Sequence, residues 1–148
     1  MNRKKFIKKI SSAIVGSAFL FPFLNDKTFP FEKRKLITPE FKPDPSTWRD
    51  DEINISWIGH ATILINFYGT IILTDPVLFE RVGLYMFGIT FGPNRYTLPA
   101  LTLEEIPKPD LVLLSHAHMD HMDYETLSCL VDLYPNEIAC ITAFNTKD

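Results

Sequence analysis

Three of the four histidines in this 148-residue chain lie within six residues, directly after a short apolar segment. The segment Asp110–Ser115 reads DLVLLS, and His116–His121 follows it with the sequence HAHMDH. An apolar run of this length, bounded by proline and polar residues, predicts a strand buried on both faces of an α/β sheet. Such sheets place their ligands in loops at the carboxyl ends of the strands. We therefore expect an α/β domain with its site at this loop.

The residue types in the loop indicate a metal site. His116 and His118 are two residues apart, so on extended backbone both rings project to the same side and can hold one ion. Asp120 and His121 follow where the chain turns, and offer an oxygen and a nitrogen to a second ion. This donor set suits Zn²⁺, with iron or manganese as other occupants. The alternative is a metal-free cluster beside an apolar strand, which carries a large desolvation cost.

The rest of the pattern predicts a layered domain with the order β-β-β-loop-β-α-β. Apolar or alternating segments predict strands at residues 53–58, 61–67, 70–74, 110–115 and 138–142. Asp123 is a typical N-cap residue, so a helix is expected after it and before Pro135. The expected apolar stripe of this helix is Leu127, Leu130, Val131 and Tyr134. Residues 76–109 contain five prolines and predict a long irregular connection. Its apolar side chains are expected in the core, and the alternative is that they line a lipid groove.

Charge divides the chain into two parts. Residues 1–35 hold nine Lys and Arg against two acids, a net charge of +7, whereas residues 36–148 have a net charge of −10. An acidic domain does not predict nucleic acid as a partner. Two cysteines, Cys129 and Cys140, are too few for a disulfide framework and are expected to be buried free thiols.

The basic part has the composition of an export signal. Residues 1–24 combine a basic start with an apolar run of about 15 residues, which is shorter than a membrane-spanning helix requires. This predicts a signal peptide or an amino-terminal anchor, and a basic amphipathic helix lying on a membrane is the alternative. The string Asn2–Lys8 is similar to a twin-arginine signal with lysine in place of the second arginine. We expect export to a bacterial periplasm or cell envelope, and an extended linker over residues 25–50.

The HxHxDH spacing resembles the metallo-β-lactamase superfamily. Three further segments occur in the order of its branch similar to N-acyl-phosphatidylethanolamine-hydrolysing phospholipase D: Trp57–Thr62, Leu73–Pro76 and Gly92–Arg95. The resemblance implies the first half of an αββα sandwich and a two-metal hydrolase, with one zinc ion on His116 and His118 and one on Asp120 and His121. It also implies a hydroxide held between the ions and oriented by Asp120, which cleaves a phosphodiester of a phospholipid or another small molecule.

Four residues outside the motif are candidates for supporting or substrate-binding roles. Asp75 ends a strand, and is expected either to hydrogen-bond a ligand imidazole or to cap a turn. His60 is interpreted either as a supporting or substrate-contacting residue or as a hydrogen-bonded core histidine. Asn94 and Arg95 lie on the long connection, where the guanidinium could meet a phosphate. The alternative is an exposed arginine without a role.

The resemblance further implies ligands that this sequence does not supply. The family takes two more histidines and a bridging aspartate from the second half of its fold, and no histidine follows His121. We therefore expect residues 51–148 to form an incomplete domain that is poorly soluble and inactive as an isolated chain. The alternative functions are a lactonase or other ester hydrolase of the same fold, and a non-catalytic membrane-tethered remnant.

Overall fold

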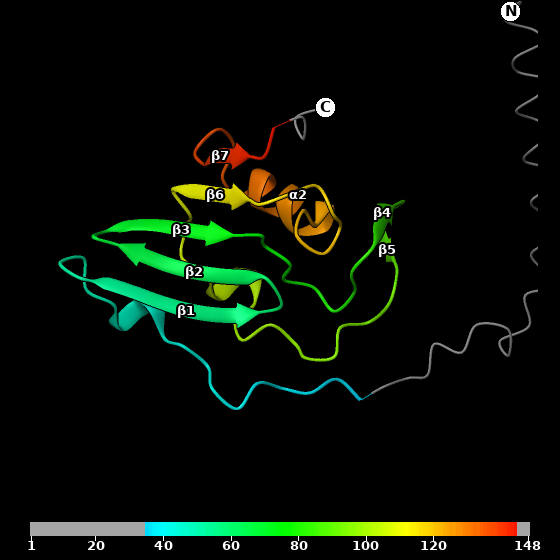
Figure 1. Ribbon diagram of the computed structural model, residues 1–148, viewed down its shortest axis with the longest axis horizontal. Helices are drawn as coiled ribbons and strands as arrows, with labels where there is room; N and C mark the ends of the chain where they lie inside the picture. The colour runs from blue at the N-terminus through cyan, green and yellow to red at the C-terminus, as the bar shows by residue number, and fades with distance from the viewer. Residues whose placement is uncertain (1–34, 145–148) are drawn as a thin grey trace, which may run out of the picture. The chain divides into compact units, whose positions relative to one another are not determined.

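A mixed five-stranded sheet organises residues 35–144, the part of the chain that the computed structural model describes (Figure 1). Its strands, in spatial order, are β1 (Ile53–Gly59), β2 (Thr62–Phe67), β3 (Thr70–Thr74), β6 (Leu111–Leu114) and β7 (Ala139–Thr142). β1, β2 and β3 are antiparallel neighbours, whereas β3, β6 and β7 run parallel. Parallel neighbours need a crossover, and α2 (Tyr124–Leu133) provides the one between β6 and β7. This is the mixed α/β architecture that the sequence predicts.

The strand predictions are confirmed to within about one residue at each end. β2 and β3 are joined by the two residues Tyr68 and Gly69, both with positive φ (50° and 85°). Two positive φ values in a two-residue connection are typical of a type I′ hairpin, whose twist matches that of the flanking strands. The turn therefore sets the register in which Phe67 pairs with Thr70.

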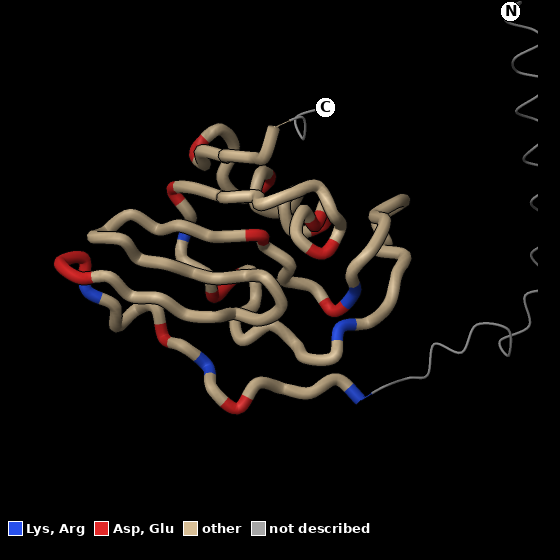
Figure 2. The backbone as a smooth tube through the Cα atoms, viewed as in Figure 1, with Lys and Arg blue, Asp and Glu red and all other residues tan. Residues whose placement is uncertain are grey.

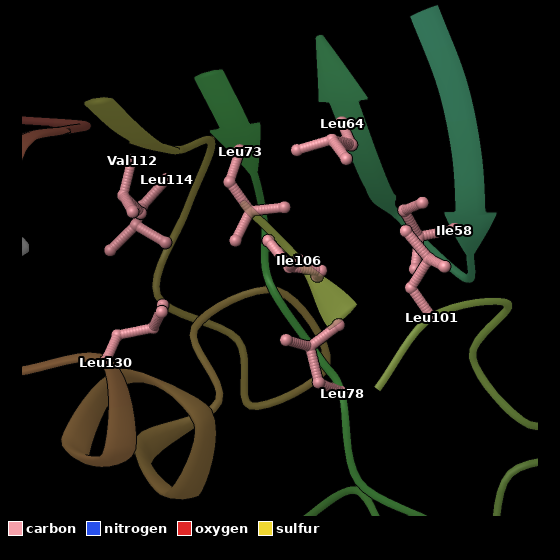
Figure 3. Packing of buried hydrophobic residues seen from close by; sticks show 9 residues of the cluster. All are labelled: Ile58, Leu64, Leu73, Leu78, Leu101, Ile106, Val112, Leu114 and Leu130. Atoms are coloured by element: carbon pink, nitrogen blue, oxygen red, sulfur yellow. The ribbon is translucent and has the colours of Figure 1, made fainter. Parts of the chain in front are cut away.

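The core lies between one face of the sheet, α2 and parts of the long connection (Figure 3). Leu64, Leu73 and Val112 contribute the sheet side, and Leu130 contributes the helix side. Burying a leucine-sized side chain contributes about 1.5–3 kcal/mol, so these residues fix how α2 packs on the sheet. The predicted apolar stripe of α2 is wrong at Val131, which is 62% exposed. The other three residues of the stripe, Leu127, Leu130 and Tyr134, do pack in or against the core.

The opposite face of the sheet is also apolar. The strand register aligns Ile55, Ile65, Ile72 and Leu111 in one row across four strands. In β1, Ile55 and Trp57 are about two-thirds exposed within the described part of the chain. A sheet with two apolar faces is the inner layer of a layered fold, and its second face is the kind of surface that another layer packs on.

The connection over residues 76–109 differs from its prediction. It contains a short hairpin, β4 (Leu84–Met86) and β5 (Ile89–Phe91), and a 3₁₀ turn, η3 (Leu103–Glu105). Leu78, Leu101 and Ile106 are buried in the core as expected. The apolar side chains of the hairpin are exposed instead, because three-residue strands that meet at Phe87-Gly88 turn one side away from the domain.

Residues 35–50 run along the edge of the domain and include the 3₁₀ turn η2 (Pro45–Thr47). Ile37 forms a bridge with Thr97, and Trp48 packs against the core. The signal or anchor over residues 1–24, and residues 25–34 of the expected linker, lie outside the described residues. Among the helices that the structure describes, none is both long enough and apolar enough to span a membrane.

Both cysteines are free, as expected, but they are not fully buried. Cys129 is half-buried on α2, and Cys140 is exposed on β7. The prediction of buried thiols is wrong for Cys140 because β7 is the edge strand of the sheet. Partial desolvation by the surrounding protein raises the pKa of both thiols above the ordinary value.

Candidate metal centre

The carboxyl ends of β3 and β6 form the base of the site. The two strands are parallel and paired from Ile72–Leu111 to Thr74–Leu113. The pairing continues past the end of β3, where the backbone N–H of Asp75 donates to the Leu113 carbonyl at 2.8 Å. Parallel pairing therefore brings the residues that follow each strand to the same edge of the sheet.

The histidine motif ends in a tight turn over residues 118–122. β6 ends at Leu114, and the carbonyl of His118 accepts hydrogen bonds from the backbone N–H of His121 (2.9 Å) and of Met122 (2.7 Å). The turn therefore begins at His118 and includes Asp120 and His121, where the sequence predicts that the chain turns. The rings of His116 and His118 lie together, with centroids 4.6 Å apart in an edge-on contact.

Asp75 connects the end of β3 to the motif. Its Oδ1 accepts a hydrogen bond from the backbone N–H of Ser115 (2.7 Å), and its Oδ2 accepts one from the Ser115 hydroxyl (2.8 Å). Oδ2 also lies 3.0 Å from Nδ1 of His121. Burial acts to raise the pKa of Asp75, but the hydrogen bonds from His121 and Ser115 outweigh it and hold the pKa below its ordinary value.

The ionised Asp75 carboxylate determines which nitrogen of His121 is available. A carboxylate only accepts, so its contact with Nδ1 requires the His121 proton on that nitrogen. In the neutral imidazole, Nε2 then carries the lone pair that a metal ion could bind, and it lies 3.8 Å from Oδ2 of Asp120. An orienting carboxylate behind the imidazole is the usual arrangement for a histidine that binds a metal.

His60, Asp120 and His121 form the cluster that could hold an ion. One donor atom from each residue lies within 4.8 Å of the other two. Oδ2 of Asp120 is 3.2 Å from Nε2 of His60, sixty residues away in the sequence. Burial acts to raise the pKa of Asp120, but the contact with His60 and the other local interactions lower it overall, so the carboxylate is available as an anionic ligand.

His116 packs between the other motif histidines. Its ring centroid is 4.0 Å from that of His121 and 4.6 Å from that of His118. Its Nδ1 is 2.9 Å from the hydroxyl of Ser115, which holds one side of the ring. The motif thus gathers three imidazoles and a carboxylate at one edge of the sheet, and His60 adds the fourth imidazole.

His60 is not a core histidine, because its side chain is 40% exposed. It follows Gly59 at the β1–β2 junction, where Gly59 and His60 both have positive φ (126° and 54°). The carbonyl of His60 accepts a hydrogen bond from the indole N–H of Trp57 at 2.7 Å. This tight junction aims the His60 ring at Asp120, which the local sequence pattern does not reveal.

The prediction for Arg95 is corrected by the structure. Both interpretations placed its side chain at the surface, but Arg95 is only 7% exposed. Its guanidinium donates to the carbonyl of Val77 and packs against Gly59, and burial lowers its pKa. Arg95 therefore ties the long connection to the sheet and does not face a substrate phosphate. Asn94 remains exposed, and forms a bridge with Arg81.

Residues 115–123, between β6 and α2, form a loop that we call the metal loop. Asp123 is its last residue and the predicted helix cap. Its Oδ2 accepts hydrogen bonds from the backbone N–H of Thr126 (3.0 Å) and from the Thr126 hydroxyl (2.6 Å). The residue is completely buried, and burial raises its pKa above the ordinary value. The cap therefore fixes the position where the loop passes into α2.

Comparison with known proteins places this arrangement in a family. The profile of the β-lactamase superfamily domain matches residues 54–141, which is more than half of the chain and includes every residue of the cluster. The chain belongs to the β-lactamase superfamily. The match runs from β1 to β7 and covers all five strands of the sheet except Ile53 and Thr142 at its two ends.

Individual members of the superfamily match over shorter stretches. The chain is 38% identical over 80 residues to N-acyl-phosphatidylethanolamine-hydrolyzing phospholipase D 1 of Caenorhabditis elegans, covering 54% of this chain and 22% of that protein. It is 37% identical over 70 residues to a UPF0173 metal-dependent hydrolase of Haloquadratum walsbyi, covering 47% and 23%. The matched segment therefore spans less than a quarter of either relative. A diiron β-hydroxylase from Streptomyces venezuelae is similar in structure, with 28% identity and a TM-score of 0.39, over 60% of this chain and 14% of that one.

Proposed function

We propose that this chain carries the metal-binding segment of a metal-dependent hydrolase that cleaves a phosphodiester, with a phospholipid as substrate. One observation carries the proposal: His60, Asp120 and His121 converge beside His116 and His118 at the carboxyl edge of two parallel strands. Membership of the β-lactamase superfamily and similarity to a phospholipase D and to a metal-dependent hydrolase support this assignment.

The residues present fit a metal centre. His116 and His118 are assigned to one ion, and Asp120 with His121 to a second, with Zn²⁺ as the occupant and iron or manganese as the alternatives. His60 lies close enough to Asp120 and His121 to join the second set. When bound, the metal ions supply Lewis-acid chemistry that lowers the pKa of a water molecule and neutralises charge on the phosphoryl group.

The chain's own residues orient this chemistry. Asp75 holds the His121 proton on Nδ1 and so presents Nε2 to the ion. Oδ2 of Asp120 lies 3.2 Å from Nε2 of His60, and the lowered pKa of Asp120 keeps the carboxylate available as an anionic ligand. Because these side chains are partly exposed, a phosphodiester can approach them directly.

The leader supports an envelope location. The basic and apolar composition of residues 1–24 favours export or anchoring at a bacterial membrane, through a twin-arginine-like signal. A membrane location suits a phospholipid substrate, because the enzyme and the lipid headgroup then occupy the same surface.

The test uses the native protein isolated from its source. We expect it to hydrolyse a bis-aryl phosphodiester faster than an aryl lactone, to lose this activity when a chelator removes the metal, and to regain it with Zn²⁺. Faster lactone hydrolysis would assign the same site to a lactonase. Activity that survives complete removal of metal would contradict the proposed chemistry.

A further inference from the structure

The β4–β5 hairpin presents an apolar surface that points away from the domain. Its register pairs Leu84 with Phe91 and Met86 with Ile89, so these four side chains share one face. Each of them is between 42% and 58% exposed, and Phe87 at the turn is 95% exposed. Most large apolar residues of a water-soluble surface occur singly, so five together at one tip mark a contact surface.

The other face of the hairpin is anchored beside the metal loop. Tyr85 stacks on Tyr124, with ring centroids 5.6 Å apart, and the buried Thr90 hydroxyl donates to the carboxylate of Glu125. Tyr124 and Glu125 form the first turn of α2, which begins directly after Asp123 at the end of the metal loop. The exposed apolar face is therefore held in place rather than frayed, by contacts with the helix turn that directly follows the metal loop.

The hairpin carries no charged side chain, and Arg81 directly precedes it. Residues 82–92 include no Asp, Glu, Lys or Arg, so the tube in Figure 2 is tan around this turn. The phenyl ring of Phe87 forms the tip, and the apolar pairs Met86–Ile89 and Leu84–Phe91 follow it on one face. Tyr85 lies between these pairs on the other face, stacked on Tyr124, and Arg81 donates to the Gly92 carbonyl at 3.0 Å where the hairpin begins. An uncharged apolar face with tyrosine beside it and arginine behind it is the composition that enters a membrane interface.

We propose that the β4–β5 hairpin inserts its tip into a phospholipid membrane and places the metal loop at the headgroups. This deepens the proposed function and rests on its phospholipid substrate. A projecting apolar tip suits a fluid lipid phase, which needs no complementary shape. The apolar rows of β1 and β2 are not proposed to enter the membrane, because a flat face with aligned rows suits the packing of another protein layer.

The test locates the hairpin relative to the lipid in the full-length chain. An environment-sensitive dye is attached at Phe87→Cys in a background with Cys129→Ser and Cys140→Ser. The matched control carries the dye at Ile55→Cys, on the apolar sheet face. The vesicles contain only phosphatidylcholine, so the basic residues 1–35, with their net charge of +7, have no anionic lipid to attract them. Lipids with a nitroxide near the headgroup report depth.

We expect vesicles to shift the emission at position 87 to the blue, and the nitroxide lipid to quench it at least twofold, with no change at position 55. Substitution of Phe87 and Ile89 by Asp should lower vesicle partition about tenfold, whereas Ile55→Asp should change it less than twofold. An unshifted signal at position 87, absence of vesicle binding, or quenching at position 55 instead overturns the proposal. So does a blue shift without vesicles that grows with protein concentration, because it identifies a protein partner. Zinc binding by the same variants is measured separately, so failure of insertion and failure of the metal site are distinguishable.

Discussion

Replacement of Asp75 by asparagine tests how the proposed metal site is oriented. The substitution keeps the shape of the side chain, and Oδ1 still accepts from the backbone N–H of Ser115. An amide NH₂ replaces Oδ2, which contacts the Ser115 hydroxyl and Nδ1 of His121. The hydroxyl can rotate to accept from the amide. The imidazole has to move its proton to Nε2, and the lone pair that would face the metal is then lost.

The contacts of Asp75 set the size of both effects. Two charge-assisted hydrogen bonds worth about 1.5–3 kcal/mol each are replaced by neutral ones worth about 1 kcal/mol each, so the free energy of unfolding falls by about 1–4 kcal/mol. Removing the carboxylate that orients a ligand histidine lowers metal affinity by about 10- to 100-fold. The loss of zinc affinity therefore separates the orienting role from a purely structural one.

The assay is competition for Zn²⁺ between the full-length chain and a chromophoric chelator near neutral pH. Asp110→Asn is the matched control, because Asp110 accepts from the backbone N–H of Ile71 at 2.8 Å at the other end of the paired strands. Both variants should lose stability, and only Asp75→Asn should lose zinc affinity. An Asp75→Asn protein that binds Zn²⁺ within twofold of the unsubstituted chain would refute the role assigned to Asp75.

Three further predictions concern stability. Asp123→Ala should cost about 1 kcal/mol through loss of the helix cap, whereas Asp123→Asn keeps the cap. Burial raises the folded-state pKa of Asp123. The unsubstituted chain should therefore lose stability relative to Asp123→Asn as the pH rises from the ordinary carboxyl pKa to the raised one, and the difference should stay constant above it. Urea unfolding at several pH values measures this difference. Leu73→Ala, at a completely buried position, should cost about 2–5 kcal/mol, and Ile55→Ala on the exposed face less than half of that, by thermal unfolding. Gly59→Ala should destabilise the chain more than Gly88→Ala does, since both have positive φ but only at Gly59 does the new Cβ meet a side-chain nitrogen, at 2.9 Å; equal losses would contradict this.

The sequence predicts those parts of the fold that depend on local pattern. The strands at β1, β2, β3, β6 and β7 carry apolar runs bounded by turn residues, and Asp123 is a local cap signal. The β4–β5 hairpin was not predicted from the sequence, because strands of three residues are too short to show an alternating pattern. The burial of the Arg95 guanidinium could not be predicted either, because its partner Val77 is eighteen residues away and the contact depends on how the long connection folds back.

The site shows the same division between local and distant information. His116, His118, Asp120 and His121 are adjacent in the sequence, so their grouping follows from the motif. The approach of His60 to Asp120 spans sixty residues and depends on the β1–β2 junction with its two positive φ values. No local pattern around His60 distinguishes this contact from a buried histidine, and only the assembled sheet edge shows it.

One short segment after β3 holds both ends of the metal loop. At the start of the loop, Asp75 accepts two hydrogen bonds from Ser115. At its end, the backbone N–H of Leu78 donates to the hydroxyl of Thr126 at 3.0 Å, and Thr126 in turn binds the carboxylate of Asp123. The loop between these two attachments is therefore positioned by the folded sheet and helix rather than by an ion.

This arrangement predicts a metal loop that is ordered before metal binds, unlike small zinc domains in which metal binding drives folding. In zinc-free protein, the amide hydrogen of Ser115 should be protected from exchange to nearly the same degree as that of Asp75, whose N–H bonds to Leu113 between the paired strands. Addition of Zn²⁺ should then change the exchange of both amides only slightly. The contrary result is a Ser115 amide that exchanges freely without metal and becomes protected only with Zn²⁺. The ion rather than the Asp75 carboxylate would then order the loop, and the contact between Asp75 and Ser115 would form only after metal binding.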